Sequence, residues 1–381
     1  MPNPSSVETA VNARVTECLQ QQVAAGTQVG VQVCVYQGAD VVVDAQAGTM
    51  GPDDGRAVQP DSLFLSFSAT KGVAATTIHM LADRGQLDYD APVAKYWPAF
   101  AASGKGEITV AQAVSHQIGL HAMPLDFEPE HIMDWDAGIK RMEQGVPAYP
   151  PGTSTGYHAV TFGWITGGIV QGVTGRHIKD FIAEEIAAPL GISDEFYVGI
   201  PTGIEARLTT LEIHGAGEGL GLAPESDFHR AMPWDMWPYF NTMPFRAACL
   251  PSGNGHFSAR ALARMYAAHA NGGTIDGTRL VSGERIAAMQ ELQTDATDIV
   301  LGVPVRKSVG FMMGGATDGI HGPMGTRESA FGHPGAGGSV GFADPEVGLA
   351  VAITINKMAY PLPGEGTTLE ITDLIRSELG C

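Results

Sequence analysis

Positive charge is scarce in this sequence of 381 residues. It holds 22 lysines and arginines against 41 aspartates and glutamates, which gives a formal net charge of −19 at pH 7. Binding to nucleic acid depends on clusters of Lys and Arg that displace counterions from phosphates, and attraction to anionic membranes needs the same charge. We therefore expect no nucleic acid and no membrane as partners, and we interpret the acidity as an aid to solubility.

Long apolar runs and a basic leader are also missing. No stretch approaches the roughly 20 apolar residues of a membrane span. Residues 1–22 are polar, without a basic segment followed by an apolar one, so no signal peptide is indicated. The cysteines show no spacing typical of a disulfide framework, and they are Cys18, Cys34, Cys249 and Cys381. Scattered free thiols are typical of the cytoplasm, which is the location we expect.

Patterns that bind metals or nucleotides are absent as well. The 12 histidines form no His-Glu-x-x-His pair, and the sequence contains no Cys-x-x-Cys, so we expect no metal. No Gly-x-Gly-x-x-Gly opens a predicted helix, so no nucleotide is implied. We expect a protein that works without a cofactor.

The chain does contain 44% apolar residues, enough for a sizeable core. Two β-branched runs near the N-terminus, 29–36 and 41–47, predict a hairpin. Near the C-terminus, residues 348–356 alternate large and small apolar side chains, which predicts a strand. Weaker strands are expected at 308–313 and 328–332. Apolar periodicity predicts helices at about 7–24, 71–84, 157–173, 176–190, 260–271 and 368–379.

Strands at both chain ends with helices between them favour an α+β fold. We expect one antiparallel sheet built from both ends, flanked by helices, with an inserted and mainly helical region. This predicts a discontinuous sheet domain of residues 1–75 and 285–381 and a helical domain of residues 76–284. The active site is expected at their interface.

One serine and one lysine, Ser68 and Lys71, are three residues apart at the start of a predicted helix. This spacing brings both side chains to one helix face, where a lysine whose pKa is lowered by burial can take the serine proton. Of the seven lysines, only Lys71 follows a serine at this spacing. The backbone N–H groups at a helix N-terminus also give Ser68 half of an oxyanion hole. The alternative is a chance pair on a solvated helix.

Further segments match a known family in order along the chain. The segment 85–93 reads Gly-Gln-Leu-Asp-Tyr-Asp-Ala-Pro-Val, the turn at 115–120 reads Ser-His-Gln-Ile-Gly-Leu, and residues 150–152 read Pro-Pro-Gly. With Ser-Ala-Thr-Lys at 68–71, the chain resembles the class C β-lactamases, the D-alanyl-D-alanine carboxypeptidases and, closest in character, the family VIII carboxylesterases. The resemblance runs from about Gly30 to Asn356. It implies the β-lactamase and penicillin-binding-protein fold and a serine that forms an acyl-enzyme.

The second motif of that family is Tyr-x-Asn, and here it reads Tyr157-His158-Ala159. The resemblance implies that Tyr157 shares proton transfer with Lys71, and a tyrosine near a lysine cation can have a lowered pKa. Otherwise Tyr157 is a core aromatic. In the β-lactamases the asparagine amide helps hold the acylamino side chain of the substrate. Ala159 cannot do this, which favours esters, and His158 is a candidate substrate-binding residue.

The third motif of the family is Lys-Thr-Gly or His-x-Gly, on a strand that lines the site. His333-Pro334-Gly335 stands in the matching place. The resemblance implies that His333 replaces the lysine, that Gly335 lets the strand approach the substrate, and that the N–H of Ala336 completes the oxyanion hole with Ser68. The alternative for His333 is a structural histidine of the strand.

Two other segments need an interpretation. Gly-x-Ser-x-Gly occurs at 337–341, but the α/β-hydrolases place their histidine after the serine, and no histidine follows Ser339, so we reject that pattern. Residues 228–245 combine large apolar side chains with three prolines, which predicts a wall over an acyl or alcohol pocket, with Trp234 and Trp237 as substrate-binding candidates. Residues 123–135 are a second candidate wall. The alternatives are internal packing or the contact of a homodimer.

The sequence therefore predicts a serine hydrolase, a carboxylesterase that cleaves a small-molecule ester through an acyl-serine. A β-lactamase, an amidase or a D-amino-acid peptidase on the same residues is one alternative, and an acyltransferase is another. A non-catalytic ligand-binding protein with the same fold is the alternative from a different class.

Overall fold

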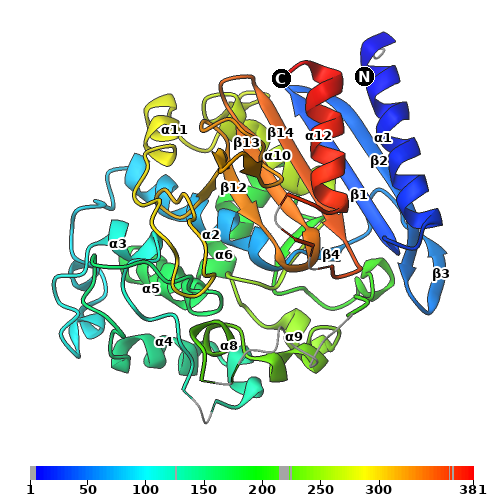
Figure 1. The fold of residues 1–381 in the computed structure, drawn as a ribbon. Coiled ribbons are helices and arrows are strands. Elements are labelled where there is room, and N and C mark those ends of the chain that lie inside the picture. The colour runs from blue at the N-terminus through cyan, green and yellow to red at the C-terminus, as the bar shows by residue number, and fades with distance from the viewer. Residues whose placement is uncertain (1–5, 125–126, 214–222, 224, 360, 363) are drawn as a thin grey trace.

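The computed structural model describes residues 6–124, 127–213, 223, 225–359, 361–362 and 364–381, except the side chains of residues 6–8 and 234. Its largest element is an antiparallel sheet of seven strands in the order β3-β2-β1-β14-β13-β12-β9 (Figure 1). The strands are β1 (Gly30–Gln37), β2 (Asp40–Gly51), β3 (Asp54–Ala57), β9 (Met312–Met313), β12 (Phe331–Pro334), β13 (Val340–Asp344) and β14 (Leu349–Ile355). Because β1 pairs with β14, the two chain ends meet within one sheet, as predicted.

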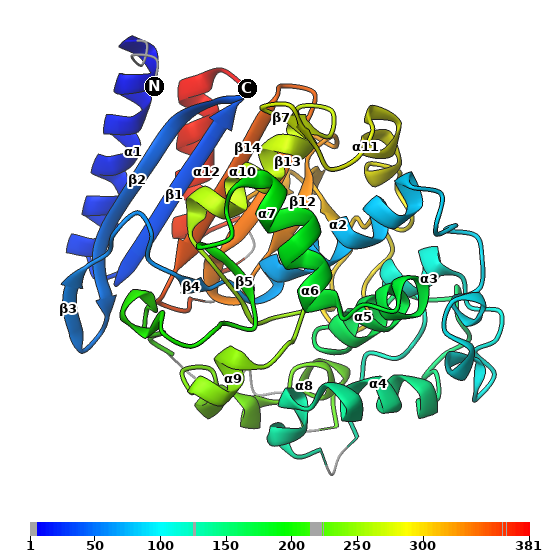
Figure 2. The ribbon, with the colours of Figure 1, turned by 180° about the vertical axis from the view of Figure 1, so that it is seen from behind.

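Helices cover both faces of this sheet. The helices α1 (Ser6–Ala24) and α12 (Thr367–Leu379) lie on one face (Figure 1), and α10 (Ala259–Ala270) lies on the other (Figure 2). The large side chains of β14 belong to the core under α1 and α12, whereas Ala350 and Ala352 belong to the core under α10. The alternation in the sequence therefore reflects a strand with two buried faces, of which the alanine face admits a close helix.

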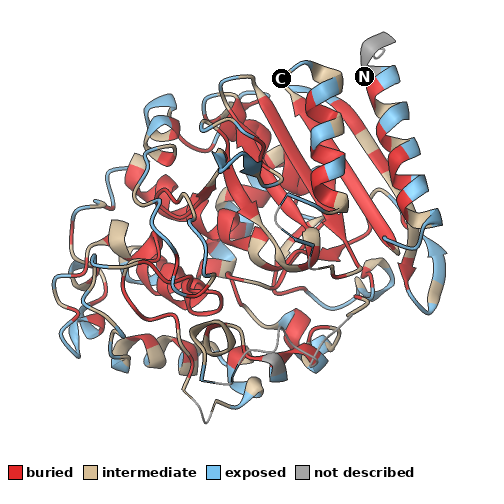
Figure 3. Cartoon of the chain, in the orientation of Figure 1, coloured by how far each residue is buried: buried red, intermediate tan, exposed pale blue. Residues whose placement is uncertain are grey.

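The helix α2 (Thr70–Asp83) runs through the interior of the molecule. All of its residues from Thr70 to Ala82 are buried (Figure 3). The Tyr266 ring of α10 packs between α2 and the sheet: a Cβ on Gly72 would lie 1.9 Å from the Tyr266 hydroxyl, and one on Gly341 would lie 2.5 Å from its ring. A side chain at the start of α2 is therefore shielded from water.

Shorter elements complete the chain. The other helices are α3 (Val110–Val114), α4 (Trp135–Gln144), α5 (Thr161–Thr174), α6 (Ile178–Ile182), α7 (Ala188–Leu190), α8 (Asp227–Ala231), α9 (Met243–Ala247) and α11 (Gly283–Met289). The other strands are β4 (Phe64–Leu65), β5 (Phe196–Val198), β6 (Gly255–Phe257), β7 (Thr274–Ile275), β8 (Thr278–Arg279), β10 (Ala316–Thr317) and β11 (Ile320–His321). The short helical turns are η1 (Phe67–Ala69), η2 (Val93–Lys95), η3 (Pro98–Ala101), η4 (Pro129–Met133), η5 (Ala183–Ala187), η6 (Glu205–Arg207), η7 (Trp234–Tyr239) and η8 (Ala336–Gly338).

Three predicted boundaries differ from the structure. The helix expected at 157–173 begins at Thr161. The backbone N–H groups of Tyr157 and His158, before this helix, donate to Asp298 Oδ1 and His116 Nδ1. The helix expected at 176–190 is a run of α6, a π turn and α7. The strand expected at 308–313 is formed only at its last two residues.

The division into a sheet domain (1–75 and 285–381) and a helical domain (76–284) stays a prediction. The helix α10 lies inside the range 76–284, yet it packs against β1, β13 and β14 of the sheet. Among the described residues, no helix is both long enough and apolar enough to cross a bilayer.

Candidate active site

Ser68 lies in the turn η1, between the short strand β4 and the helix α2. Phe67, just before it, has a φ of +45°, a left-handed conformation that is rare for a bulky residue. The turn is fastened to Gly255 of β6, whose O accepts from the N–H of Ser66 at 2.8 Å and whose N–H donates to Thr70 Oγ1 at 2.9 Å. Strained backbone of this kind persists only where the surroundings hold it, and it is common at active sites.

Lys71 is fully buried beside Ser68. Its Nζ lies 3.0 Å from Ser68 Oγ, and it donates to the backbone oxygens of Ala159 at 2.7 Å and Ser252 at 2.8 Å. Burial removes an ammonium ion from water, and this holds the pKa of Lys71 well below its usual value of 10.5. A neutral amine has two N–H groups, which the two carbonyls satisfy, so its lone pair is left for the Ser68 hydroxyl.

Tyr157 approaches Ser68 from the segment before α5. Its hydroxyl donates to Ser68 Oγ at 2.8 Å, and Lys71 Nζ lies 4.9 Å from the centre of its ring. Burial raises the pKa of Tyr157, so the expectation of a lowered pKa was wrong. Desolvation disfavours the phenolate and is the largest cause of this rise. The structure thus brings together the three residues predicted to be catalytic, with Tyr157 as a protonated phenol.

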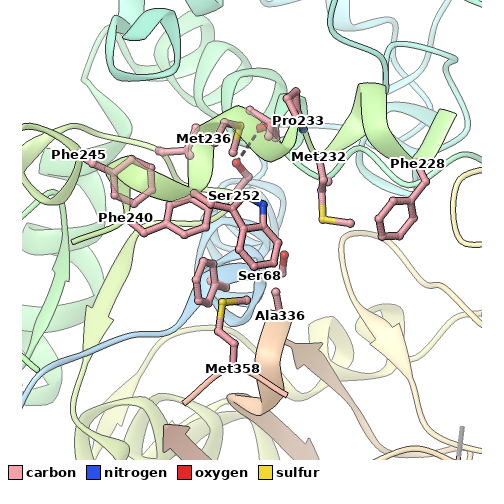
Figure 4. Close-up of a pocket in the computed structure, with 16 residues that line it drawn as sticks. Ser68, Phe228, Met232, Pro233, Met236, Phe240, Phe245, Ser252, Ala336 and Met358 are labelled. Atoms are coloured by element: carbon pink, nitrogen blue, oxygen red, sulfur yellow. Dashed lines mark hydrogen bonds between the residues drawn. The ribbon is translucent and has the colours of Figure 1, made fainter. Parts of the chain in front are cut away.

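An apolar cavity of about 660 Å³, its open mouth included, begins at Ser68 (Figure 4). Figure 4 shows Ser68 and Ala336 at one edge and Met232, Pro233 and Met236 at the opposite edge. Most of the lining comes from residues 228–253, which we call the cavity wall. The lining residues are Phe67, Ser68, Ala159, Val160, Phe228, Met232, Pro233, Met236, Trp237, Phe240, Phe245, Leu250, Ser252, Gly253, Ala336 and Met358.

Comparison with known proteins places this site in a family. Residues 15–373 match the family model described as beta-lactamase.

The chain belongs to the beta-lactamase family.

This beta-lactamase-family protein is 37% identical over 348 residues to the Esterase/beta-lactamase LipL of Mycobacterium tuberculosis (strain ATCC 25618 / H37Rv), with 87% of this chain and 78% of the relative covered. A crystal structure of a family VIII carboxylesterase superposes with a TM-score of 0.87 at 33% identity, covering 97% of both chains. A penicillin-binding-protein homologue from Caulobacter crescentus also gives a TM-score of 0.87 at 33% identity, with 99% of both chains covered. The predicted family and fold are confirmed, and the protein is a serine hydrolase of this family.

Gly335 lies where the strand β12 meets the nucleophile turn. A Cβ at this position would lie 2.4 Å from the Ser66 carbonyl oxygen and 3.4 Å from the Ala69 nitrogen, so only glycine permits the approach. Ala336, the next residue, lines the cavity together with Ser68. This is the placement that an oxyanion hole of their two N–H groups requires, and the hole itself stays a prediction.

The two histidines predicted to bind substrate, His333 and His158, do not line the cavity. His333 is buried, its ring centre lies 5.9 Å from that of Tyr157, and burial lowers its pKa to about 3. The buried His158 accepts a hydrogen bond from the N–H of Leu120 at 3.1 Å. Tyr157 is absent from the lining too, so substrate binding by His333 and His158 stays a prediction.

Of the two tryptophans predicted to bind substrate, only one has a described side chain. Trp237 lines the cavity, whereas the side chain of Trp234 lies outside the described part of the structure. None of the described residues of the second candidate wall, 123–135, lines the cavity.

Sequence reasoning missed Ser252, whose carbonyl holds Lys71 and whose hydroxyl donates to Val160 O at 2.6 Å. It also missed a buried ion pair, Asp298 with Lys307, next to Tyr157. A backbone acceptor has no side-chain signature, and no sequence pattern marks Lys307 as buried. Within the described residues, no three His, Cys, Asp or Glu side chains are grouped to hold a metal ion.

Proposed function

We propose that this protein is a carboxylesterase that cleaves small-molecule carboxylic esters through an acyl-Ser68 intermediate. The observation that carries the proposal is the position of Ser68 Oγ, 3.0 Å from the buried Lys71 Nζ and 2.8 Å from the Tyr157 hydroxyl at the edge of an apolar cavity. The family VIII carboxylesterase, at 33% identity, supports ester chemistry by its name. LipL, at 37% identity, is named an esterase/beta-lactamase, which supports ester chemistry and keeps the β-lactamase as the alternative.

In the acylation step, neutral Lys71 takes the proton of Ser68 as Ser68 Oγ attacks the ester carbonyl carbon. The N–H groups of Ser68 and Ala336 hold the negative oxygen of the tetrahedral intermediate. Tyr157 donates its proton to the leaving alcohol oxygen and recovers one from the Lys71 ammonium. The bond between the acyl carbon and the alcohol oxygen breaks, and the acyl group stays on Ser68.

In the deacylation step, a water molecule replaces the alcohol. Its proton passes to the same Lys71 and Tyr157 pair as its oxygen attacks the acyl carbon, and the proton then returns to Ser68 Oγ. The carboxylic acid leaves and the starting protonation states are restored.

Two features favour esters over lactams and amides. Ala159 lines the cavity at the position where the β-lactamases carry the asparagine that holds an acylamino group. Among the lining side chains only the Ser68 and Ser252 hydroxyls and the Trp237 ring carry polar atoms. An apolar acyl group loses little by entering such a space, whereas an acylamino group would leave its polar atoms without partners.

The test compares hydrolysis of a p-nitrophenyl acyl ester series with that of a chromogenic cephalosporin. Ser68→Ala is the test variant, and Ser377→Ala, on the exposed face of α12, is the matched control. We expect ester turnover in the wild type and the control, little cephalosporin turnover, and no ester turnover in Ser68→Ala. Faster turnover of the cephalosporin would identify a β-lactamase, and turnover of neither would favour the amidase, acyltransferase or binding-protein alternatives.

We also propose a cytoplasmic location and a small-molecule ester as the partner. The location is supported by the four cysteines, all of which are free. Fractionation of the native host with an antibody against the protein tests it, and recovery outside the cytoplasm would contradict it.

A further inference from the structure

A buried ion pair lies against the segment that carries Tyr157. Asp298 and Lys307 both have fully buried side chains, and Lys307 Nζ lies 2.5 Å from Asp298 Oδ2. Moving two charges out of water costs about as much as their attraction returns, so a pair like this adds little to stability over apolar side chains of similar size. We therefore look for the role of the pair in the groups to which the two side chains are hydrogen-bonded.

The Asp298 carboxylate gathers backbone N–H groups from two segments. Its Oδ1 accepts from the N–H of Tyr157 at 3.1 Å, and also from Val300 at 2.9 Å and Leu301 at 3.0 Å. Together with Lys307 on Oδ2, these donors use the acceptor capacity of the carboxylate. The carboxylate thereby joins the loop after position 298 to the backbone of the tyrosine.

Lys307 holds the same segment two residues earlier. Its Nζ donates to Thr155 Oγ1 at 2.7 Å, and the N–H of Ile299 donates to the Thr155 carbonyl at 3.0 Å. The pair is thus hydrogen-bonded to both ends of the segment 155–157. Tyr157 precedes α5, which begins at Thr161, so no helical hydrogen bond fixes its N–H.

This matters because the Tyr157 hydroxyl must stay within hydrogen-bond distance of Ser68 Oγ, 2.8 Å away. A displacement of about 1 Å in a proton-transfer group can cost 10²-fold in rate. The negative charge of Asp298 is also one of the causes that raise the pKa of Tyr157, and this favours the protonated phenol that serves as a donor.

We propose that Asp298, held by Lys307, is a positioning residue that fixes the backbone of Tyr157 so that its hydroxyl can protonate the leaving alcohol. This inference rests on the proposed function, because it assumes that Tyr157 is that proton donor. The loss of activity on replacing Asp298 should depend on the leaving group of the ester. An ethoxide must be protonated as it leaves, whereas a p-nitrophenolate leaves without a proton.

The experiment measures kcat/KM for ethyl butyrate and p-nitrophenyl butyrate, two esters with the same acyl group. The test variant is Asp298→Ala/Lys307→Met, which removes the acceptor without leaving an unpaired buried charge. Asp298→Asn/Lys307→Met restores an uncharged acceptor at the same place. We expect the first variant to lose activity on ethyl butyrate by about tenfold or more beyond its loss on the p-nitrophenyl ester, and the second to recover most of that difference.

Asp344→Ala/Arg376→Met is the matched control. It removes a buried ion pair of 2.9 Å at the α12 side of the sheet. It also leaves Met324 O and Ser329 Oγ without these partners, so it should lower the melting temperature and leave the ratio of the two esters unchanged. The same ratio in the Asp298→Ala/Lys307→Met variant as in the wild type, or no recovery in the Asn variant, would overturn the inference.

Tyr157→Phe separates this inference from the proposed function. In one outcome, Tyr157→Phe loses kcat/KM for ethyl butyrate selectively while the Asp298→Ala/Lys307→Met variant does not. In that case only the positioning role of Asp298 fails. If Tyr157→Phe shows no selective loss, the proposed role of Tyr157 fails, and the inference fails with it.

Discussion

The floor and the wall of the cavity are built on opposite principles. What we call the floor is Ser68, which lines the cavity, together with its neighbours Lys71 and Tyr157. The positions of these polar groups are set by hydrogen bonds at 2.7–3.0 Å to one another and to two backbone carbonyls. The wall consists mainly of methionine and aromatic side chains that touch through apolar contacts. The floor therefore has one working arrangement, whereas the flexible side chains of Met232 and Met236 in the wall can adapt to different acyl groups. Chemistry and substrate choice should respond to different substitutions.

The largest effect is expected from Lys71→Met on the floor. Without the amine, nothing takes the Ser68 proton, and kcat/KM for p-nitrophenyl butyrate should fall by about 10³-fold or more. The carbonyls of Ala159 and Ser252 lose their donor, which costs about 1–3 kcal/mol of stability for an unsatisfied buried acceptor. Steady-state kinetics and thermal unfolding measure the two effects. Lys140→Met, at an exposed position of α4, is the control, and retention of a tenth of the activity by Lys71→Met would rule out Lys71 as the base.

The second effect concerns the protonation of Lys71 in the floor. Burial lowers the pKa of Lys71, and only its neutral form can accept a proton, so kcat/KM should fall about tenfold per pH unit below that pKa. Between the lowered folded pKa and 10.5 the unfolded chain binds more protons than the folded chain. The free energy of unfolding contributed by Lys71 should therefore rise with pH across this window.

A pH–rate profile, with denaturant unfolding of wild type and Lys71→Met over the same range, measures both quantities. An activity that is flat from the acid side up to pH 10 would show that Lys71 does not act as a base. A stability slope that is unchanged in Lys71→Met would show that its pKa is not lowered.

The smallest effect is expected from Met236→Ala on the wall. The side chain lines the cavity, and its truncation enlarges the space, so the preferred acyl chain should lengthen by one to a few carbons. The change in kcat/KM should be about five- to tenfold in favour of the longer p-nitrophenyl esters, since each added methylene is worth about 0.8 kcal/mol when buried. Met243→Ala, at a partly exposed position of α9, should leave the profile unchanged. An equal loss on every chain length would mean that Met236 supports the fold and not the pocket.

Much of the fold and of the candidate site could be predicted from the sequence, because the residues concerned lie in short patterns. The spacing of Ser68 and Lys71 places both groups at one helix start, and the alternation in β14 marks a strand, so the fold and the floor residues could be predicted. The acceptors of Lys71 could not, since they are the backbone oxygens of Ala159 and Ser252, and any residue has such an oxygen.

One error about the site comes from burial, which no local pattern measures. The pKa of Tyr157 was expected to fall because of a nearby cation, but burial lowers the pKa of Lys71 and raises that of Tyr157. The ring of His158 accepts a hydrogen bond from the N–H of Leu120, and its contact with the substrate stays a prediction.

The most direct test of the central claim is covalent labelling with a fluorophosphonate, followed by peptide mapping. We predict one adduct on the peptide that contains Ser68, no adduct in Ser68→Ala, and much slower labelling in Lys71→Met. Labelling of another serine, such as Ser339 in the Gly-x-Ser-x-Gly pattern, or no labelling of the wild type, would contradict the assignment of Ser68 as the nucleophile.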